Sequence, residues 1–337
     1  MAILVTGGTG FIGRRLVECL ARQGERVHVL DVAAGTASKG RNEGAKFFSG
    51  DIQNPDDVEG AMAGCDRVYH LAAYAKNWAP NEQLFVEVNV DGAQVVFDAA
   101  LKLNVKKVVH TSSNVALGPS NGAQVEEFSK RSEEFFTAYE RSKFLSEKLV
   151  KKYVQRGLDV VIVNPTRVFG PGPLNESNSV TKMIQWYLQG KWRVILGNGL
   201  MVGNYVYVDD LVNGYVLAMK HGRTGERYIL GGENVSFNGF FERLSEVSNQ
   251  HYRMLHVPGR FAMAFSRVEE FRSRHFRHFP LITPGWVRTF LSDWANSCGK
   301  AQRELGYSIT PLNAALRNTI NWLEESAQDR TLSTEGR

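Results

Sequence analysis

Cysteine is scarce in this 337-residue chain, which has only Cys19, Cys65 and Cys298, far apart in the sequence. An odd number of isolated cysteines predicts neither a disulfide framework nor a zinc site, and it favours a reducing, cytoplasmic location. The eight histidines stand alone or in the pair His275 and His278, without a matching cluster of carboxylates. We therefore expect no metal site in this protein.

Long apolar runs are missing as well. No stretch approaches the roughly 18 apolar residues that a membrane-spanning helix needs, so we expect no membrane span. The first six residues already have the pattern of a β-strand, which leaves no room for a signal peptide. The composition, with 43% hydrophobic and 22% charged residues, is typical of a globular protein with a sizeable core.

The excess of positive charge is small overall, at +5, but it is concentrated late in the chain. Between residues 251 and 279, phenylalanine and methionine are interleaved with six arginines and only two glutamates. This pattern predicts an amphipathic helical cap, with a wall of the substrate pocket and a membrane-surface or nucleic-acid contact as alternatives. No recognised nucleic-acid motif accompanies the charge, so we expect no nucleic-acid partner. The six arginines are Arg253, Arg260, Arg267, Arg272, Arg274 and Arg277.

Short apolar runs alternate with helical patterns through the first half of the chain. These runs are rich in valine, isoleucine and leucine without polar alternation, which is typical of strands buried on both faces of a parallel sheet. The alternation predicts an α/β fold with a Rossmann-type doubly wound parallel sheet. We expect strands at 2–5, 27–30, 67–71, 107–110 and 160–163, and helices at 13–23, 56–62, 88–103 and 138–156.

The second half mixes the two patterns and predicts a smaller, mixed C-terminal substrate domain. Helices are expected at 181–189, 237–249 and 311–325, and strands at 205–208 and 227–230. We expect a dinucleotide-binding Rossmann domain over 1–168, to which 205–232 return, a substrate-binding region over 169–204 and 233–327, and a frayed polar tail over 328–337.

A glycine-rich turn follows the first expected strand. The segment from 6 to 13 reads TGGTGFIG and connects this strand to a helical pattern. Glycines let the backbone turn sharply and approach a pyrophosphate, while the helix N-terminus offers free N–H groups and the positive end of its dipole. The place between a strand and a helix supports a dinucleotide-binding turn. The candidate cofactor contacts here are Gly7, Thr9, Gly10, Phe11, Ile12 and Gly13.

Acidic residues follow the next two strands. Asp31 ends the second strand, where a carboxylate accepts hydrogen bonds from the adenosine ribose and repels a 2′-phosphate. This favours NAD over NADP, although Lys39 and Arg41 in the following loop can bind a phosphate and keep NADP open. Asp51, at the end of the third strand, can accept from the adenine amino group, with Ile52 against the ring. A plain turn or helix cap is the alternative role for Asp51.

Candidate catalytic groups come from a helix and from the end of a strand. Tyr139 and Lys143 stand four residues apart in a helical pattern, which puts both on one face. A nearby ammonium lowers the pKa of a phenol from about 10, so Tyr139 can exchange a proton with a carbonyl or an alcohol. Lys143 can also hold the nicotinamide ribose. Thr111, Ser112 and Ser113 end the fourth strand, where a serine can hydrogen-bond the substrate oxygen.

The order and spacing of these motifs resemble the extended short-chain dehydrogenase/reductases. This family includes the NAD-dependent epimerase/dehydratases and the ketone reductases that are similar to dihydroflavonol reductase. The resemblance covers residues 1 to about 235, and its specificity comes from the whole set and not from any single motif. The motifs are TGGTGFIG at 6–13, GDI at 50–52, HLAA at 70–73, VNVDGA at 88–93, TSS at 111–113, YERSK at 139–143, NPTRVFGPG at 164–172 and NYVYVDDL at 204–211.

The resemblance implies a catalytic Ser–Tyr–Lys triad, and it also implies further cofactor contacts. The serine of the family falls on Ser113, with Ser112 as the second choice, and it acts with Tyr139 and Lys143. Asn89 is expected to be mainly structural. Homodimers are usual in this family, often through the helix that carries the tyrosine and its neighbour. The further residues that the resemblance assigns to the cofactor are Leu71, Ala72, Ala73, Pro165 and Val168.

Two enzymatic interpretations use the same triad. The first is an NAD(P)-dependent oxidoreductase that interconverts a ketone and a secondary alcohol on a fairly apolar small molecule by hydride transfer. The second is an NAD-dependent nucleotide-sugar epimerase or dehydratase. A non-catalytic dinucleotide-binding scaffold is a further alternative, although such relatives typically lose the tyrosine or the lysine, and both are present here.

One departure from the family pattern favours the apolar ketone or alcohol. Sugar-nucleotide members usually carry an Arg-Asp pair where this chain has Gly203 and Asn204, and the arginine binds the diphosphate of the substrate. The late arginines between 253 and 277 are able to compensate for this loss. Aromatic residues in the same segment can line an apolar pocket, with plain helix packing as the alternative. These apolar residues are Phe261, Met263, Phe265, Phe271, Phe276 and Phe279.

Overall fold

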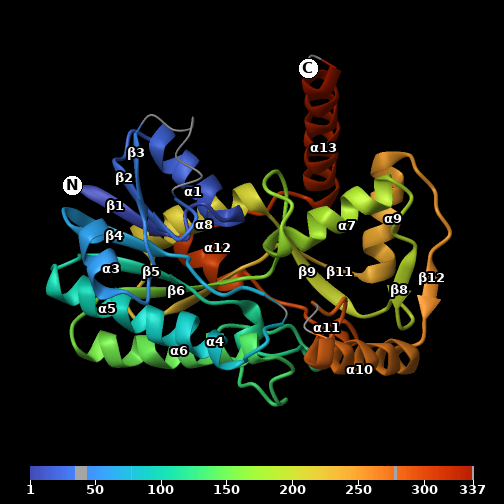
Figure 1. The fold of residues 1–337 in the computed structure, drawn as a ribbon, viewed down its shortest axis with the longest axis horizontal. Helices are drawn as coiled ribbons and strands as arrows, with labels where there is room; N and C mark the ends of the chain where they lie inside the picture. Colours follow the sequence, from blue (N-terminus) through green and yellow to red (C-terminus); the bar gives the residue numbers. More distant parts are fainter. Residues whose placement is uncertain (35–43, 77, 277–278, 336–337) are drawn as a thin grey trace.

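A computed structural model describes residues 1–34, 44–76, 78–276 and 279–335, with side chains up to residue 328. The described chain forms two lobes, a larger one on a parallel sheet and a smaller one on short mixed sheets (Figure 1). Lys39, Arg41, Arg277 and His278, which the sequence singles out, lie outside the described residues.

In the described part of the chain, seven parallel strands form the main sheet, in the order β10-β6-β5-β4-β1-β2-β3. The order reverses between β1 and β4, and ligands of such folds bind beyond the carboxyl ends of the strands at this point. The strands are β1 (Ala2–Thr6), β2 (Val27–Asp31), β3 (Ala45–Ser49), β4 (Cys65–His70), β5 (Lys107–Thr111), β6 (Val160–Pro165) and β10 (Arg227–Leu230).

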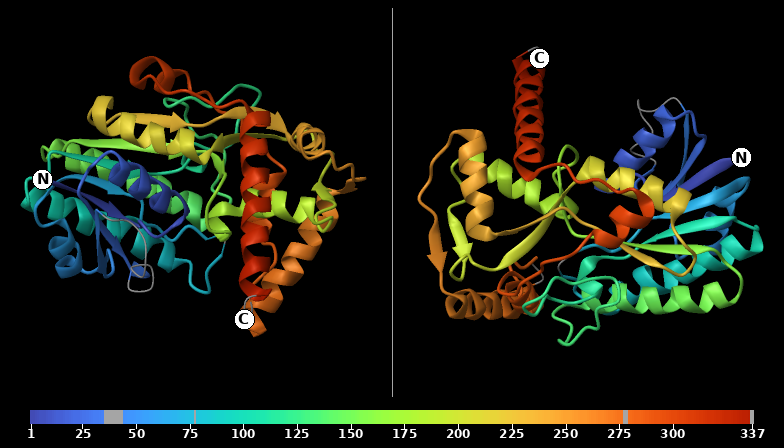
Figure 2. Two further views of the ribbon diagram at one scale, coloured as in Figure 1. Left: turned by 90° about the horizontal axis from the view of Figure 1, so that it is seen from above. Right: turned by 180° about the vertical axis from the view of Figure 1, so that it is seen from behind.

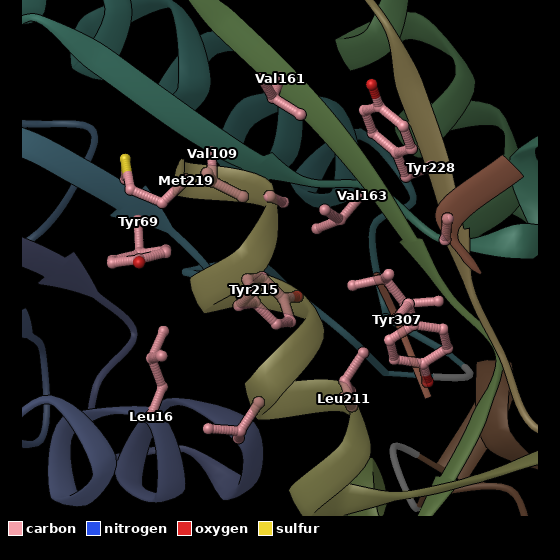
Figure 3. Packing of buried hydrophobic residues seen from close by; sticks show 14 of the residues in the cluster. Leu16, Tyr69, Val109, Val161, Val163, Leu211, Tyr215, Met219, Tyr228 and Tyr307 are labelled. Carbon is pink, nitrogen blue, oxygen red and sulfur yellow. The ribbon is translucent and has the colours of Figure 1, made fainter. Parts of the chain in front are cut away.

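Helices cover both faces of this sheet, as the buried strand patterns predict. Successive side chains of a strand point to opposite faces, so Ile3 packs beneath α1, α8 and α12, whereas Leu4 packs beneath α3, α5 and α6. Figure 3 shows Tyr215 of α8 in the same buried cluster as the strand residues Val109 and Val163. The helices are α1 (Phe11–Arg22), α3 (Pro55–Met62), α4 (Gln83–Val86), α5 (Gly92–Lys102), α6 (Ala138–Gln155), α8 (Val208–His221) and α12 (Gly299–Leu305).

The smaller lobe has its own aromatic core. Antiparallel β11 and parallel β7 flank β9, and helices pack their apolar faces against this sheet. The first half of the terminal helix α13 packs in this core, its far end extends away from the sheets, and α10 lies at the margin of the lobe (Figures 1 and 2). The elements are β7 (Arg167–Phe169), β8 (Val194–Leu196), β9 (Val202–Tyr207), β11 (Glu233–Ser236), β12 (Leu255–Val257), α7 (Ser179–Leu188), α9 (Phe237–Ser248), α10 (Gly259–Phe276), α11 (Pro284–Phe290) and α13 (Leu312–Glu335).

The structure corrects several sequence-based boundaries. β9 begins at Val202 and lies in the smaller sheet, and Val208 is already the first residue of α8. α12, expected in the substrate-binding region, packs on α8 and β10 of the larger lobe. The expected helix over 88–103 is interrupted by a π-helical turn at Glu87–Asp91.

Helix α13 continues to Glu335, through most of the polar segment for which the sequence predicts fraying, and the frayed tail stays a prediction. Once a helix is nucleated, each added residue gains a backbone hydrogen bond, and a polar sequence does not prevent this elongation. The division of the chain into separate nucleotide-binding and substrate-binding domains stays a prediction.

Candidate active site

The glycine turn lies at the carboxyl end of β1. Gly7 has φ +71°, a conformation that favours glycine, and a Cβ there would lie 2.7 Å from the Ala72 backbone nitrogen. A Cβ on Gly13 would collide with the Gly7 carbonyl oxygen, so α1 starts directly against the turn. Gly10 is the N-cap of α1 and provides no side-chain cap. Bare backbone beside an open helix N-terminus fits a pyrophosphate group.

Asp31 lies beside this turn. Its carboxylate accepts hydrogen bonds from the backbone N–H groups of Thr9, at 3.1 Å, and Ala33, at 3.0 Å. Each carboxylate oxygen has a second lone pair, so both remain able to accept from ribose hydroxyls. By contrast, Phe11 is buried and Ile12 is partly buried against the core, so these two residues offer mainly backbone to a ligand.

Asp51 and Ile52 are engaged within the protein. The Asp51 carboxylate accepts from the Gln53 backbone N–H at 2.9 Å, which is the turn role that the sequence left open. Ile52 is buried and packs beside Gly92 of α5. The adenine contacts predicted for these two residues stay predictions.

Of the remaining predicted cofactor residues, Leu71, Ala72 and Pro165 lie at the carboxyl ends of strands in the main sheet. Leu71 and Ala72 follow β4, and their backbone N–H groups donate to the Thr6 carbonyl and hydroxyl oxygens, both at 3.2 Å. This places them beside the glycine turn, with Ala73 next in the chain. Pro165 ends β6, and Val168 of β7 is buried in the core.

Ser113, Tyr139 and Lys143 come together where β5 ends and α6 begins. Ser113 follows β5 as the N-cap of a short 3-10 turn, and its side chain lies close enough to Tyr139 to lower the pKa of the phenol. The Lys143 Nζ lies 5.9 Å from the centre of the Tyr139 ring and donates to the Thr111 carbonyl at 2.9 Å. Ser112, the second choice, is buried with no hydrogen-bond partner for its hydroxyl.

Burial dominates the proton affinities of this cluster. It raises the pKa of Tyr139 to about 12, against the opposing effect of the Ser113 hydrogen bond. It also lowers the pKa of Lys143 to about 8, opposed by the negative charge of Glu147. The lowered Tyr139 pKa expected from the sequence is therefore wrong for the protein without ligand, and Tyr139 is a neutral phenol at neutral pH.

Asparagines hold this cluster in place. Asn89, in the π-helical turn, accepts from the Tyr74 backbone N–H at 2.7 Å and donates to the Ser142 hydroxyl at 2.9 Å. Asn164 of β6 donates to the Ser113 carbonyl at 3.0 Å and to Glu147 at 2.7 Å. The structural role expected for Asn89 matches these contacts.

A buried ion pair next to Tyr139 was not predictable from the sequence motifs. Arg131 contacts the carboxylate of Glu140 at 2.6 Å and also donates to the Val115 carbonyl at 2.7 Å. It thereby ties the segment that follows Ser113 to the start of α6. The acidic residue inside YERSK was the available signal, but its partner lies in a loop without any motif.

His70 and His110 are buried in the core of the larger lobe. His70 and His110 stack with ring centres 5.3 Å apart, and burial lowers the pKa of His70 to about 3. Over residues 1–34, 44–76, 78–276 and 279–335, no three histidine, cysteine or acidic side chains gather as metal ligands. In the same residues no helix is both apolar and long enough to span a bilayer.

Comparisons with known proteins identify the family that the sequence motifs resemble. The chain is 32% identical over 337 residues to sterol demethylase protein B of Methylococcus capsulatus, with 96% of this chain and 99% of the relative covered. It is 30% identical over 333 residues to a Synechocystis sp. protein named for dihydroflavonol 4-reductase, with 97% and 96% covered. The crystal structure of a dTDP-glucose 4,6-dehydratase from Streptomyces venezuelae with NAD and TYD bound has a TM-score of 0.78 and 25% identity, covering 96% of this chain and 97% of that one.

The model of the NAD dependent epimerase/dehydratase family matches residues 3–231, which include the glycine turn, Ser113, Tyr139 and Lys143. This protein therefore belongs to the NAD-dependent epimerase/dehydratase family of the extended short-chain dehydrogenase/reductases.

Proposed function

We propose that this protein is an NAD-dependent oxidoreductase that interconverts a ketone and a secondary alcohol on a largely apolar substrate. The observation that carries the proposal is the meeting of Ser113, Tyr139 and Lys143 at the carboxyl end of β5, along the same edge of the main sheet as the glycine turn after β1. Two relatives named for sterol and dihydroflavonol chemistry, both with apolar ring systems, support the substrate class. NAD is supported by the Asp31 carboxylate and by the family.

Residues of this chain perform the proton chemistry. When bound, the cofactor would supply a hydride to the ketone carbon as NADH, or accept one from the alcohol as NAD⁺. Tyr139 donates its phenolic proton to the ketone oxygen, because its pKa of about 12 keeps it protonated at neutral pH. Ser113 hydrogen-bonds the same oxygen and orients it. The Lys143 ammonium lies close enough to stabilise the phenolate that Tyr139 becomes.

The smaller lobe, formed mainly by 169–204 and 233–327, is the substrate-binding part in this proposal. We also infer a homodimer that pairs through α6 and its neighbouring helix, and a cytoplasmic location, from the family resemblance and the cysteine pattern. Sedimentation of the full chain at micromolar concentration tests the dimer, and a monomer would reject it.

The variant Tyr139→Phe tests the proposed chemistry. It removes the proton donor, and we expect NADH oxidation with a panel of apolar ketones to fall at least about 100-fold, the usual contribution of general acid catalysis. NADH binding, followed by fluorescence, should stay within twofold. Tyr153→Phe on the same helix is the matched control, because its hydroxyl interacts with the Gln94 carbonyl, at 3.5 Å, and with the side chains of Asp98 and Arg156, and not with the proposed catalytic groups.

Retained turnover in Tyr139→Phe contradicts the proposal. Thermal unfolding of wild type with UDP or GDP tests the nucleotide-sugar alternative. A nucleotide that binds the native state raises the unfolding midpoint. We expect no shift with either nucleotide.

A further inference from the structure

Arg167 carries a positive charge that no described carboxylate balances. Its Nη1 donates to the Tyr205 hydroxyl at 3.3 Å, and its Nη2 is buried with no hydrogen-bond partner. Burial removes water from a guanidinium, and without an acceptor no new hydrogen bond compensates for this loss. Buried guanidinium groups are therefore usually paired with an acceptor or have a functional role.

Aromatic rings surround this guanidinium but do not supply an acceptor. Its central carbon lies 5.0 Å from the ring centre of Phe237, 5.2 Å from that of Phe290 and 5.6 Å from that of Tyr205. Ring faces attract a cation, and they also hold the guanidinium in one orientation. The result is a fixed, half-buried cation whose N–H groups are largely unused.

Two paths connect Arg167 to the proposed catalytic groups. Along the chain, Asn164 lies three residues before it and donates to the Ser113 carbonyl. Across the lobes, Phe290 is preceded by Thr289, whose hydroxyl lies 3.5 Å from the Glu140 carboxylate, next to Tyr139. Arg167 thus lies among residues of β9, α9 and α11, and two short connections join it to the groups that hold the proposed catalytic residues.

The structure also changes the meaning of Gly203. From the sequence alone, glycine at 203 indicates the loss of a substrate-binding arginine. In the structure, Arg167 pairs with Tyr205 in the neighbouring strand, and a Cβ on Gly203 would lie 2.8 Å from the Arg167 Nη1. A guanidinium therefore occupies this region after all, and the small residue at 203 makes room for it.

We propose that Arg167 binds a carboxylate group of the substrate, an inference that rests on the proposed function. One fixed guanidinium neutralises one negative charge, and its planar fork matches a carboxylate with two parallel hydrogen bonds. The substrate is then a largely apolar ketone or secondary alcohol that carries one carboxylate. The aromatic rings around Arg167 exclude water and strengthen this pair.

Matched acids and esters test this site. The measurement is kcat/KM for NAD reduction with 3-hydroxydecanoate, trans-4-hydroxycyclohexanecarboxylate and 3β-hydroxy-5-cholenoate, each beside its neutral methyl ester. Wild type should prefer the best acid over its ester by roughly 10- to 100-fold, the range of a hydrogen bond to a charged group. Arg167→Gln should abolish this preference by losing activity with the acid alone. Arg303→Gln, an exposed arginine on α12, is the matched control and should keep it.

Each outcome decides the question. Equal use of acid and ester by wild type, or an equal loss of both in Arg167→Gln, overturns the carboxylate site and leaves the proposed function intact. If Arg167→Gln does not fold, Arg167→Lys replaces it, and an unchanged preference for the acid in that variant counts against bidentate binding.

A panel that gives no NAD reduction at all counts against the proposed function instead. The acids and esters are then compared as ligands that raise the unfolding midpoint in the presence of NAD. If acid and ester raise the unfolding midpoint equally, the carboxylate site is overturned. It is also overturned if only UDP raises the midpoint and if this rise is lost in Arg167→Gln.

Discussion

Lys143 holds its ammonium group inside the protein, at 3% exposure, with the Thr111 carbonyl as its hydrogen-bond partner. Burial lowers its pKa from 10.5 to about 8, so charging this group is harder in the native state than in the unfolded chain. Between pH 8 and 10.5 the unfolded chain keeps the proton that the native protein has lost, and native stability rises with pH in this window.

The variant Lys143→Met should remove this pH dependence. From pH 7 to 10.5, the stability of wild type should increase by about 3 kcal/mol relative to Lys143→Met, as measured by urea unfolding. Lys151→Met changes an exposed residue on the same helix, and its free energy of unfolding should differ from that of wild type by the same amount at every pH. If the free energy of unfolding of Lys143→Met also differs from that of wild type by the same amount at every pH, burial does not lower the pKa of Lys143.

Asp31 should set the choice between the two nicotinamide cofactors. Its carboxylate repels a 2′-phosphate, so wild type should prefer NAD, and Asp31→Ala should narrow the NAD-to-NADP ratio of kcat/KM by roughly 10-fold or more. Asp31→Asn is the control that keeps the acceptor for the Thr9 backbone while it removes the charge. A wild type that already prefers NADP rejects this role of Asp31.

The sequence predicts some of these residues and misses others for a physical reason. Tyr139 and Lys143 are found from their spacing, because one helix brings them together. Arg131 and Arg167 contact residues that are distant in the sequence. The most distant of these is Phe290, which lies 123 residues after Arg167. Nothing in the local pattern of either arginine indicates which surface it will meet after folding.

At the scale of elements, α10 has its amphipathic pattern reversed. The helix expected between 251 and 279 forms, but it buries small and polar residues and exposes its phenylalanines, with Phe265 50% exposed. A helical periodicity shows that two faces differ, but it does not show which one packs against the protein. The buried residues are Ala262, Ser266, Glu269 and Ser273.

This orientation predicts an unusual order of mutational effects. Ser266 is fully buried, so Ser266→Leu overpacks the contact with the protein and should lower the free energy of unfolding by about 1–3 kcal/mol. Phe265→Ser should change it by less than about 0.5 kcal/mol. If urea unfolding gives the opposite order, α10 packs through its aromatic face.

Strands buried on both faces were the most predictable elements, whereas β9 was found only in part. The predicted strand began at Tyr205, because glycine and asparagine at 203 and 204 weaken a strand pattern. In the structure Asn204 joins the sheet and also donates through its side chain to the Gly232 carbonyl at 2.9 Å and to Asn234 at 2.8 Å. A side chain that bonds a neighbouring strand compensates for low strand propensity, but only in the folded state.

At the scale of the whole molecule, the segment around α11 joins the two lobes. The Ser120 and Val125 N–H groups of the larger lobe donate to the carbonyls of Asp293 and Ala295, at 2.8 and 2.9 Å. Trp294 in turn donates to the Val202 carbonyl of β9 at 2.8 Å. The fold class is predictable from the sequence, but this junction is not, since it depends on loops with no regular pattern.

Gly285→Ala should test whether this junction positions the proposed catalytic tyrosine. A Cβ on Gly285 would collide with the Phe136 carbonyl oxygen, which is backbone and lies three residues before Tyr139. Either α11 or the start of α6 must then move. We expect kcat to fall on the order of 10- to 100-fold, because small misplacements of reacting groups are costly, while NAD affinity stays within twofold.

Gly60→Ala is the matched control, since a Cβ on this exposed residue of α3 meets no atom within 4 Å. It should leave kcat unchanged and raise the free energy of unfolding by about 0.4–1 kcal/mol, because alanine restricts the unfolded chain. An unchanged kcat in Gly285→Ala rejects the positioning role of the junction. A parallel loss of NAD affinity rejects it too, because the disturbance would then reach the glycine turn, on the far side of β5 and β4 from α6.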